Sequence, residues 1–244
     1  MTRRFHRLGV PLLAILLVAA AFVTGLLDTA EARPKPTPTG YDVLFVRHAE
    51  ASPSTGPLSE LGLSQAAALA ALLHDEPVNA VYTSMLLRAF QTGAAVATDH
   101  NLPLVADALI NEVEFDFTGV PPASIPGVVG ERLRQWLEGE NRDEGFGGES
   151  FNDVQSRWNE WWSSFVAEHR TDRGTAVVVA HGALLILMIP EVCHNALDPD
   201  FVLGHPLFNT AIVKTRLHRN GTLSCTEWAG TPIPSAAAAA VKGR

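Results

Sequence analysis

The sequence predicts an α/β protein, a three-layer αβα sandwich with a mostly parallel central sheet and an antiparallel edge. Two runs, 43–46 and 175–180, are apolar almost throughout, as expected for strands buried on both faces of a parallel sheet. Segments of helical composition alternate with strand-like runs, which is typical of a sheet covered by helices on both faces. Near the end, segments 211–217 and 223–228 flank Asn220-Gly221 and predict a hairpin that forms the antiparallel edge.

The first 32 residues have the pattern of a secretory signal peptide. Three arginines within the first seven residues are followed by an apolar stretch, 10–27, and Ala30-Glu31-Ala32 has the small-residue spacing of a signal-peptidase site. We therefore expect cleavage after Ala32 and export to a secreted, periplasmic or cell-envelope location, with no stable membrane association after cleavage. An uncleaved membrane anchor is the alternative, because roughly 18 mostly apolar residues can span a bilayer.

The remaining chain divides into a linker, one domain and a tail. Residues 33–40 are rich in proline and lack core-forming side chains, so they are expected to be a linker. The folded domain is expected at 41–229. Residues 230–244, with five consecutive alanines, are expected to form a low-complexity tail.

Local composition gives the order of the elements within the domain. The predicted strands are residues 43–46, 78–82, 104–109, 175–180, 211–217 and 223–228. The predicted helices are residues 64–73, 86–98, 131–137, 150–169 and 183–189. Alanine and leucine give the first of these helices good propensity, and Pro190 is expected to interrupt the last. The segment 111–130 contains three prolines and is expected to be a loop.

The helix at 150–169 has the clearest local signals. Ser150-x-x-Asp153 fits a capping box at its start. Aromatic side chains from Phe151 to Phe165 recur at helical spacing, and we interpret them as core residues rather than as an aromatic binding face.

Charge and cysteine content narrow the class of protein. The net charge of −8 argues against a nucleic-acid partner, which would need a basic face. A small anionic substrate stays possible, because a few convergent cations suffice to bind it.

The two cysteines, Cys193 and Cys225, give neither a disulfide framework nor a CxxC metal motif. They could form one bridge in an oxidising compartment, but we favour unpaired thiols.

Polar and cationic residues follow three of the predicted strands. Arg47-His48 ends the first, Ser84 ends the second with Arg88 one turn into the next helix, and His181-Gly182 ends the fourth. Ligands of open α/β sheets bind outside the carboxyl ends of the strands, where parallel neighbours meet. Two guanidinium groups and two imidazoles at that edge predict a site for a tetrahedral oxyanion.

The chemistry of such a cluster favours a histidine nucleophile. Phosphate-loop, dinucleotide-binding and HExxH motifs are absent from the sequence, and the arginines beside the histidines oppose a metal cation. A neutral imidazole can attack phosphorus, and Glu112, Glu114 and Asp116 are the candidate proton donors. A hydrolase using Ser84 with His181 lacks the sequence context of a nucleophile elbow.

Structural roles are the alternatives for two of these residues. Arg47 could pair with Glu50, and His181 could be a turn histidine without chemistry.

The block Arg47-His48-Ala49-Glu50 resembles the Arg-His-Gly signature of the histidine phosphatase (phosphoglycerate mutase-like) superfamily. Later stretches are similar to further motifs of that family, in the same order. They are residues 58–66, 82–92, 148–150 and 179–182, with Asn111-Glu112 at the position of the acidic proton donor. The resemblance implies the phosphoglycerate mutase-like form of the αβα sandwich.

The resemblance also implies roles for individual residues. His48 is the expected nucleophile, and Glu112 is the proton donor favoured over Glu114. Phosphate contacts are expected from Arg47, Arg88, His181 and, near the last strands, Asn209. No metal and no cofactor are implied. The implied activity is an exported, metal-independent phosphomonoesterase acting on a small phosphorylated substrate, with the oligomeric state unknown.

Two departures from the family pattern bear on activity. Ala49 replaces a glycine, and its Cβ is expected to crowd the backbone near the phosphate. The loop after Glu50 is short, which weakens the reading as a mutase. A mutase-type phosphotransferase and an envelope protein that binds phosphate ligands without turnover are therefore the alternatives.

Overall fold

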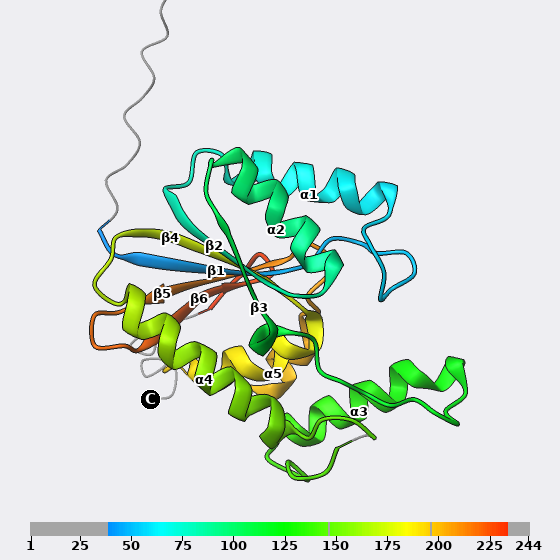
Figure 1. Cartoon of the computed structure of the whole chain (residues 1–244). Coiled ribbons are helices and arrows are strands. Elements are labelled where there is room, and N and C mark those ends of the chain that lie inside the picture. Colours follow the sequence, from blue (N-terminus) through cyan, green and yellow to red (C-terminus); the bar gives the residue numbers. More distant parts are fainter. Residues whose placement is uncertain (1–38, 146, 196, 234–244) are drawn as a thin grey trace, which may run out of the picture. The chain divides into compact units, whose positions relative to one another are not determined.

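A seven-stranded sheet forms the centre of the protein, with strand order β3-β2-β4-β1-β5-β6-β7 (Figure 1). The computed structural model describes residues 39–145, 147–195 and 197–233, and the predicted signal peptide lies outside these residues. The strands are β1 (Tyr41–Arg47), β2 (Val78–Ser84), β3 (Leu104–Asp107), β4 (Gly174–Ala180), β5 (Ile212–Leu217), β6 (Leu223–Trp228) and β7 (Thr231–Pro232). The first four strands are parallel and the last three antiparallel, which confirms the predicted sheet.

Helices cover both faces of the sheet and complete the three layers. The helices are α1 (Glu60–Leu73), α2 (Leu87–Asp99), α3 (Ile125–Leu137), α4 (Phe151–His169), α5 (Gly182–Val192) and α6 (Pro199–Gly204), with 3-10 turns η1 (Ala108–Ile110) and η2 (Pro122–Ser124). Figure 1 shows α1 and α2 on one side of the sheet and α4 and α5 on the other. In the part of the chain that the structure describes, no helix is long and apolar enough to cross a membrane.

The apolar run of β1 is buried on both faces. Val43 and Phe45 belong to the large core cluster beneath α4 and α5, whereas Leu44 and Val46 belong to the cluster beneath α1 and α2. Because successive side chains of a strand point to opposite faces, a strand between two helical layers needs apolar residues at every position. This explains why the sequence of β1 does not alternate.

The aromatic side chains of α4 pack in the core, as predicted. Both bonds of the capping box between Ser150 and Asp153 are present. Phe151 and Trp158 are fully buried, and Phe165 is nearly so. Burial of each such side chain contributes about 2 to 3 kcal/mol, so this helix is a main support of the sheet.

Three helices differ from the sequence prediction. Helix α1 begins at Glu60, four residues early, because Ser59 caps it by accepting a hydrogen bond from the Gly62 amide. Helix α3 begins inside the predicted loop, since Pro126 occupies its first turn, where a missing N–H costs nothing. Helix α5 is not interrupted at Pro190 but continues to Val192. Pro190 lies in its last turn, so little regular helix follows it.

Two further elements were missing from the prediction. The short helix α6 has its N-cap at Asp198, whose side chain accepts from the amides of Asp200 and Phe201. Strand β7 falls in the predicted tail and pairs with β6. The rest of that tail, 234–244, lies outside the described residues.

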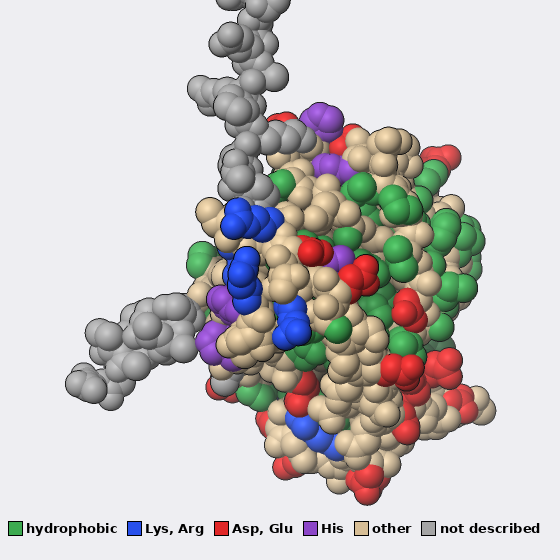
Figure 2. Space-filling view, turned by 60° about the vertical axis from the view of Figure 1, so that its left-hand side comes forward, with side chains coloured by type: hydrophobic (Ala, Val, Ile, Leu, Met, Phe, Trp, Pro, Cys, Tyr) green, Lys and Arg blue, Asp and Glu red, His purple; other side chains and the backbone are tan. Residues whose placement is uncertain are grey.

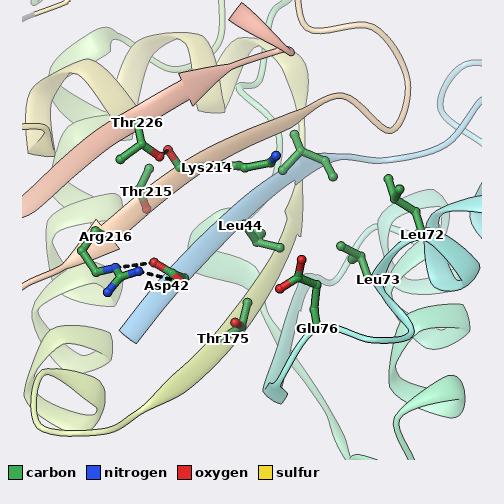
Figure 3. Close-up of a pocket in the computed structure, with 11 residues that line it drawn as sticks. Asp42, Leu44, Leu72, Leu73, Glu76, Thr175, Lys214, Thr215, Arg216 and Thr226 are labelled. Atoms are coloured by element: carbon green, nitrogen blue, oxygen red, sulfur yellow. Dashed lines mark hydrogen bonds and ion pairs between the residues drawn. The ribbon is translucent and has the colours of Figure 1, made fainter. Parts of the chain in front are cut away.

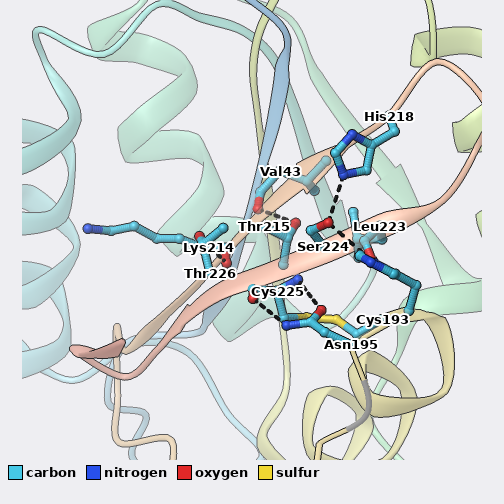
Figure 4. The surroundings of a disulfide bond; sticks show 11 residues. Val43, Cys193, Asn195, Lys214, Thr215, His218, Leu223, Ser224, Cys225 and Thr226 are labelled. Carbon is cyan, nitrogen blue, oxygen red and sulfur yellow. Dashed lines mark hydrogen bonds between the residues drawn. A yellow bond between two sulfur atoms is a disulfide. The ribbon is translucent and has the colours of Figure 1, made fainter. Parts of the chain in front are cut away.

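A disulfide bond joins Cys193 to Cys225, so the expectation of unpaired thiols was wrong (Figure 4). Cys193 is the C-cap of α5, and Cys225 lies in β6, with 5.8 Å between their Cα atoms. The side chain of Asn195 bonds both the amide and the carbonyl of Cys225, at 2.9 and 2.8 Å, and keeps the two segments together. The sequence did not show that the final hairpin folds beneath the end of α5.

We predict that the disulfide stabilises this arrangement substantially. Removing it with Cys193→Ser/Cys225→Ser should lower the free energy of unfolding by about 3 to 4 kcal/mol, the chain-entropy value for a loop of this length. Urea unfolding of the variant and of the native protein, each with and without reductant, measures the difference. A reductant that destabilises the native protein no more than the variant would contradict the prediction.

Candidate active site

Parallel pairing brings the ends of β2, β4 and β1 to one edge of the sheet. Arg47 lies opposite Ala180, and Thr83 lies opposite Val179. The pairing continues past β1, because the amide of His48 donates to the carbonyl of Ala180 at 3.0 Å. The residues that follow the three strands therefore gather at one place.

The imidazole of His48 is held on both of its nitrogens. Nδ1 lies 2.7 Å from the carbonyl oxygen of Ala49, which can only accept a hydrogen bond, so Nδ1 carries the proton. Nε2 lies 3.1 Å from Nε of Arg88, which can only donate, so Nε2 presents its lone pair. This is the tautomer in which Nε2 can act as a nucleophile.

His48 is neutral at physiological pH. Burial, reinforced by the charges of Arg88 and Arg47, lowers its pKa to about 4, although the hydrogen bond to Ala49 acts in the opposite direction. A neutral imidazole keeps the lone pair that a nucleophile needs.

The second histidine lies beside the first, with 5.1 Å between the ring centroids of His48 and His181. His181 is fully buried, and its Nε2 lies 2.6 Å from Oγ of Ser84. Burial, the coupling to His48 and the charges of the neighbouring arginines lower its pKa to about 2. A histidine with so low a pKa is a poor general base, which argues against a Ser84–His181 hydrolase despite the short contact.

Two arginines supply positive charge to this edge. Arg88, in the first turn of α2, is buried, and burial lowers its pKa. Nη1 of Arg47 donates to the carbonyl of Leu207 at 2.6 Å, whereas its buried Nε has no partner among the described residues. Glu50 does not pair with Arg47, because its carboxylate bonds the hydroxyl of Ser59. Glu50 therefore does not neutralise Arg47, and the charges of both arginines can attract an anionic ligand.

The carboxylate of Glu112 sits at the N-terminus of α5. It accepts hydrogen bonds from the amides of Leu184 at 3.0 Å and Ala183 at 3.4 Å. These bonds and the charge of Arg88 favour the ionised form, but burial outweighs them and raises the pKa of Glu112. Glu114 is exposed, so the geometry favours Glu112 as the acid at this edge.

An ion pair that the sequence analysis did not identify fixes the segment carrying Glu112. Arg157 of α4 forms a bidentate pair with Glu149, at 2.7 and 2.9 Å. The same guanidinium donates to the carbonyls of Leu109, Asn111 and Glu112, at 2.7, 2.9 and 3.3 Å. Arg157 therefore holds three carbonyls of one loop in place. The only feature of the sequence that pointed to this ion pair was the position of Glu149 directly before the capping box.

Asn209 and Ala49 shape the backbone at His48. Nδ2 of Asn209 donates to the carbonyl of His48 at 2.9 Å, and a direct contact between Asn209 and phosphate stays a prediction. The methyl group of Ala49 is fully buried in a small cluster with Leu58 and Ala66. It therefore packs on neighbouring apolar residues, and the crowding of the backbone near the phosphate stays a prediction.

Neither a metal cluster nor the hollow drawn in Figure 3 contains the residues of this edge. Among the described residues, no group of three or more His, Cys, Asp or Glu side chains could hold a metal ion. A hollow of about 340 Å³ lies between β1, β5 and the end of α1 (Figure 3). Its lining includes Asp42, Leu72 and Lys214 and none of the predicted site residues.

Comparison with known proteins gives a family match over most of the chain. The family described as "Histidine phosphatase superfamily (branch 1)" matches residues 43–229. Phosphoserine phosphatase 1 of Hydrogenobacter thermophilus is 30% identical over 125 residues, which are 51% of this chain and 58% of that protein. A 2,3-bisphosphoglycerate-dependent phosphoglycerate mutase 2 of Gloeobacter violaceus is 29% identical over 154 residues, 60% of this chain and 68% of the mutase. The chain thus spans less than two thirds of the first of these relatives.

Solved structures share the fold at lower identity. A mycobacterial glucosyl-3-phosphoglycerate phosphatase with bound VO3 has a TM-score of 0.62 and 22% identity, over 77% of this chain and 98% of that one. A mutant phosphoserine phosphatase of Entamoeba histolytica in complex with phosphoserine has a TM-score of 0.59 and 19% identity, over 78% of this chain and 98% of that one.

We predict that Arg157 stabilises the fold and helps to keep the pKa of Glu112 raised. Arg157→Ala leaves Glu149 without its partly buried partner and should lower the free energy of unfolding by about 2 to 3 kcal/mol. With its loop released toward water, Glu112 should titrate at a lower pH than in the native protein, measured by carbon-13 NMR of its carboxyl group.

Arg142→Ala provides a matched control. Arg142 also binds a carboxylate and a backbone carbonyl, those of Glu191 and Trp136, and does not contact the Glu112 loop. It should reduce stability without moving the pKa of Glu112. An equal change of that pKa in both variants would contradict the assignment.

Proposed function

Because the chain belongs to the histidine phosphatase superfamily (branch 1), we propose that it is an exported, metal-independent phosphomonoesterase working through a phosphohistidine at His48. The observation that carries the proposal is the neutral imidazole of His48, with a proton on Nδ1 and the lone pair of Nε2 directed at Arg88. A phosphate group that binds Arg88 is brought to the nucleophile by the same contact.

In the first step, Nε2 of His48 attacks the phosphorus atom and the bond from phosphorus to the ester oxygen breaks. The departing oxygen needs a proton, which the protonated carboxyl group of Glu112 donates. The raised pKa of Glu112 keeps that proton available at higher pH than an ordinary glutamate would.

In the second step, the ionised carboxylate of Glu112 takes a proton from a water molecule. The resulting hydroxide attacks phosphorus, the bond from phosphorus to Nε2 breaks, and inorganic phosphate leaves. Both the proton on Glu112 and the lone pair of His48 are then restored, so the cycle needs no other reactant.

Fixed positive groups stabilise the transferring phosphoryl group. Arg47 and Arg88 donate to its oxygens, and Nδ1 of His181, which has no partner among the described residues, is a further donor. With the Ser84 hydroxyl donating to Nε2, neutral His181 keeps its proton on Nδ1. Donors placed before the reaction need no reorganisation during it, which is the main advantage of such sites.

The substrate we propose is a small phosphate monoester rather than a nucleic acid. Relatives and structural neighbours are named for phosphoserine and for glucosyl-3-phosphoglycerate, and these two compounds are the first to assay.

Export is supported by the pattern of residues 1–32 and by the Cys193–Cys225 disulfide, because such bonds persist in oxidising compartments. Mass spectrometry of the N-terminus of the exported protein should find Arg33 first, and an intact Met1 would favour the anchor instead.

A phosphoryl-transferring mutase is the second candidate, favoured by the similarity to a phosphoglycerate mutase. The two functions differ in the acceptor, which is water in a phosphatase and a second hydroxyl in a mutase. Assays with phosphoglycerate that follow isomer exchange and phosphate release together separate them, because only the mutase exchanges isomers without releasing phosphate.

We predict that phosphate release from a panel of phosphomonoesters survives EDTA and is lost in His48→Ala. His74→Ala, a change of an exposed histidine on the far end of α1, serves as control and should be as active as the native protein. Activity retained in His48→Ala would exclude the phosphohistidine. No release by the native protein from any ester would favour the protein that binds phosphate without turnover.

The pH dependence should be bell-shaped. As pH falls through about 4, His48 becomes protonated and loses its lone pair, so kcat/KM falls on the acid side. As pH rises through the raised pKa of Glu112, the acid for the leaving group is lost, so kcat/KM falls on the alkaline side. Steady-state rates across this range check both limbs.

Glu112→Gln tests the origin of the alkaline limb. In the first turnover, before water attacks, it should slow release of the alcohol from alkyl phosphates by about 100-fold or more, and much less the release of para-nitrophenol, whose departing oxygen needs no proton. An equal loss for both esters would mean that Glu112 is not the acid. Glu114→Gln is the matched control and should leave both rates unchanged.

A further inference from the structure

A second cationic cavity lies away from the predicted active site. It has a volume of about 380 Å³ and is formed by the start of β1, the connection from α4 to β4, and the turn between β5 and β6. Its lining includes four arginines, one carboxylate and one histidine, which are Arg170, Asp172, Arg173, Arg216, His218 and Arg219, and the phenol of Tyr41. The three segments are far apart in the sequence, so the fold itself gathers these arginines.

The cavity is at the opposite edge of the sheet from His48. Tyr41, the first residue of β1, lines the cavity, whereas Arg47 at the other end of β1 belongs to the catalytic cluster. Seven residues of strand separate the two sites by about 20 Å. A ligand in this cavity therefore does not contact the catalytic residues.

Positive charge in the cavity exceeds negative charge. Arg216 is paired with Asp42, at 2.5 and 3.0 Å. In contrast, Arg170, Arg173 and Arg219 are exposed, and their side chains form no ion pair or hydrogen bond with another described residue. A chain with a net charge of −8 has thus placed four arginines around one hollow. Figure 2 shows Lys and Arg side chains grouped on the upper left of this face and acidic side chains over its lower and right parts.

The carboxylates nearby do not cancel this charge. Asp42 neutralises Arg216, and Asp172 lines the cavity but also bonds Nδ1 of His169 at 3.0 Å. Four guanidinium groups and two carboxylates leave an excess of two positive charges. A phosphate dianion carries two negative charges and would balance this excess. Guanidinium groups remain protonated at any physiological pH and match the oxygens of phosphate in pairs.

We propose that this cavity binds a phosphate dianion, separately from catalysis. The phosphate group can belong to a small phosphorylated molecule or to a lipid with a phosphomonoester headgroup, such as phosphatidic acid, because both present a phosphate dianion. The test has a separate arm for each source.

The test is a titration of the purified protein with inorganic phosphate, followed at single amides by NMR. Saturable shifts are expected at Gly40, Gly174 and Arg219 around the cavity, with a separate set at Ala49 and Gly182 from the catalytic edge. In Arg170→Gln/Arg173→Gln/Arg219→Gln, affinity at the cavity should fall at least about tenfold, with the catalytic set unchanged.

A control with the same change of net charge excludes a general electrostatic effect. Arg132→Gln/Arg134→Gln/Lys214→Gln removes three cations outside the cavity and should keep the cavity shifts. Equal loss in both variants, or shifts only at the catalytic edge, would overturn the proposal. Shifts only at the cavity would instead count against the proposed catalytic function, so the two failures are distinguishable.

Vesicles distinguish the two sources of phosphate. Sedimentation with vesicles that contain phosphatidic acid is compared with sedimentation with phosphatidylcholine vesicles, because an attached apolar stretch would bind both alike. An excess on phosphatidic acid that the cavity variant loses and the control keeps assigns the site to lipid headgroups. The absence of that excess, with phosphate shifts present, assigns it to small phosphorylated molecules. The absence of both overturns the proposal.

Discussion

The imidazole of His48 is held between a carbonyl that accepts from one nitrogen and a guanidinium that donates to the other, and the rest of the site depends on this arrangement. The carbonyl of Ala49 fixes the proton on Nδ1. Without a ligand, the lone pair of Nε2 accepts a hydrogen bond from Nε of Arg88. Burial and two arginines hold the ring neutral. A phosphate dianion relieves the repulsion between those arginines, so the same charges that activate the nucleophile also bind the ligand.

Helix α5 connects the proposed acid, Glu112, to the proposed nucleophile, His48. His181 is its N-cap, its first amides bind the carboxylate of Glu112, and its last turn is joined through Cys193 to β6. From the other side, Arg157 fixes the backbone of Glu112. The acid is therefore attached to two elements of the core, which allows a buried carboxyl group to keep one orientation through both half-reactions.

The sequence was sufficient to predict the sheet and the residues at its edge, because both depend on local patterns. The apolar run before Arg47 and the one before His181 each marked a buried strand, and parallel strands end at the same edge. Long-range contacts had no such signal. The roles of Glu112 and Glu114 depend on which of them meets α5, and Arg157 acts on carbonyls more than forty positions away.

Two other predictions were wrong for different reasons. Pro126 was assigned to a loop, although the first turn of a helix accepts proline, so this error had a local cause. The Cys193–Cys225 bond depends on where the last hairpin packs, which residues distant in sequence decide.

The central claim is that His48 carries the phosphoryl group, and trapping that intermediate tests it most directly. The protein is mixed rapidly with para-nitrophenyl phosphate, quenched in alkali, where phosphohistidine survives, and digested for mass spectrometry. The account predicts one added phosphoryl group on the peptide containing His48, more abundant in Glu112→Gln, in which water is not activated, and absent from His48→Ala. A phosphoryl group on Ser84 or His181, or turnover with none trapped in either the native protein or Glu112→Gln, would contradict it.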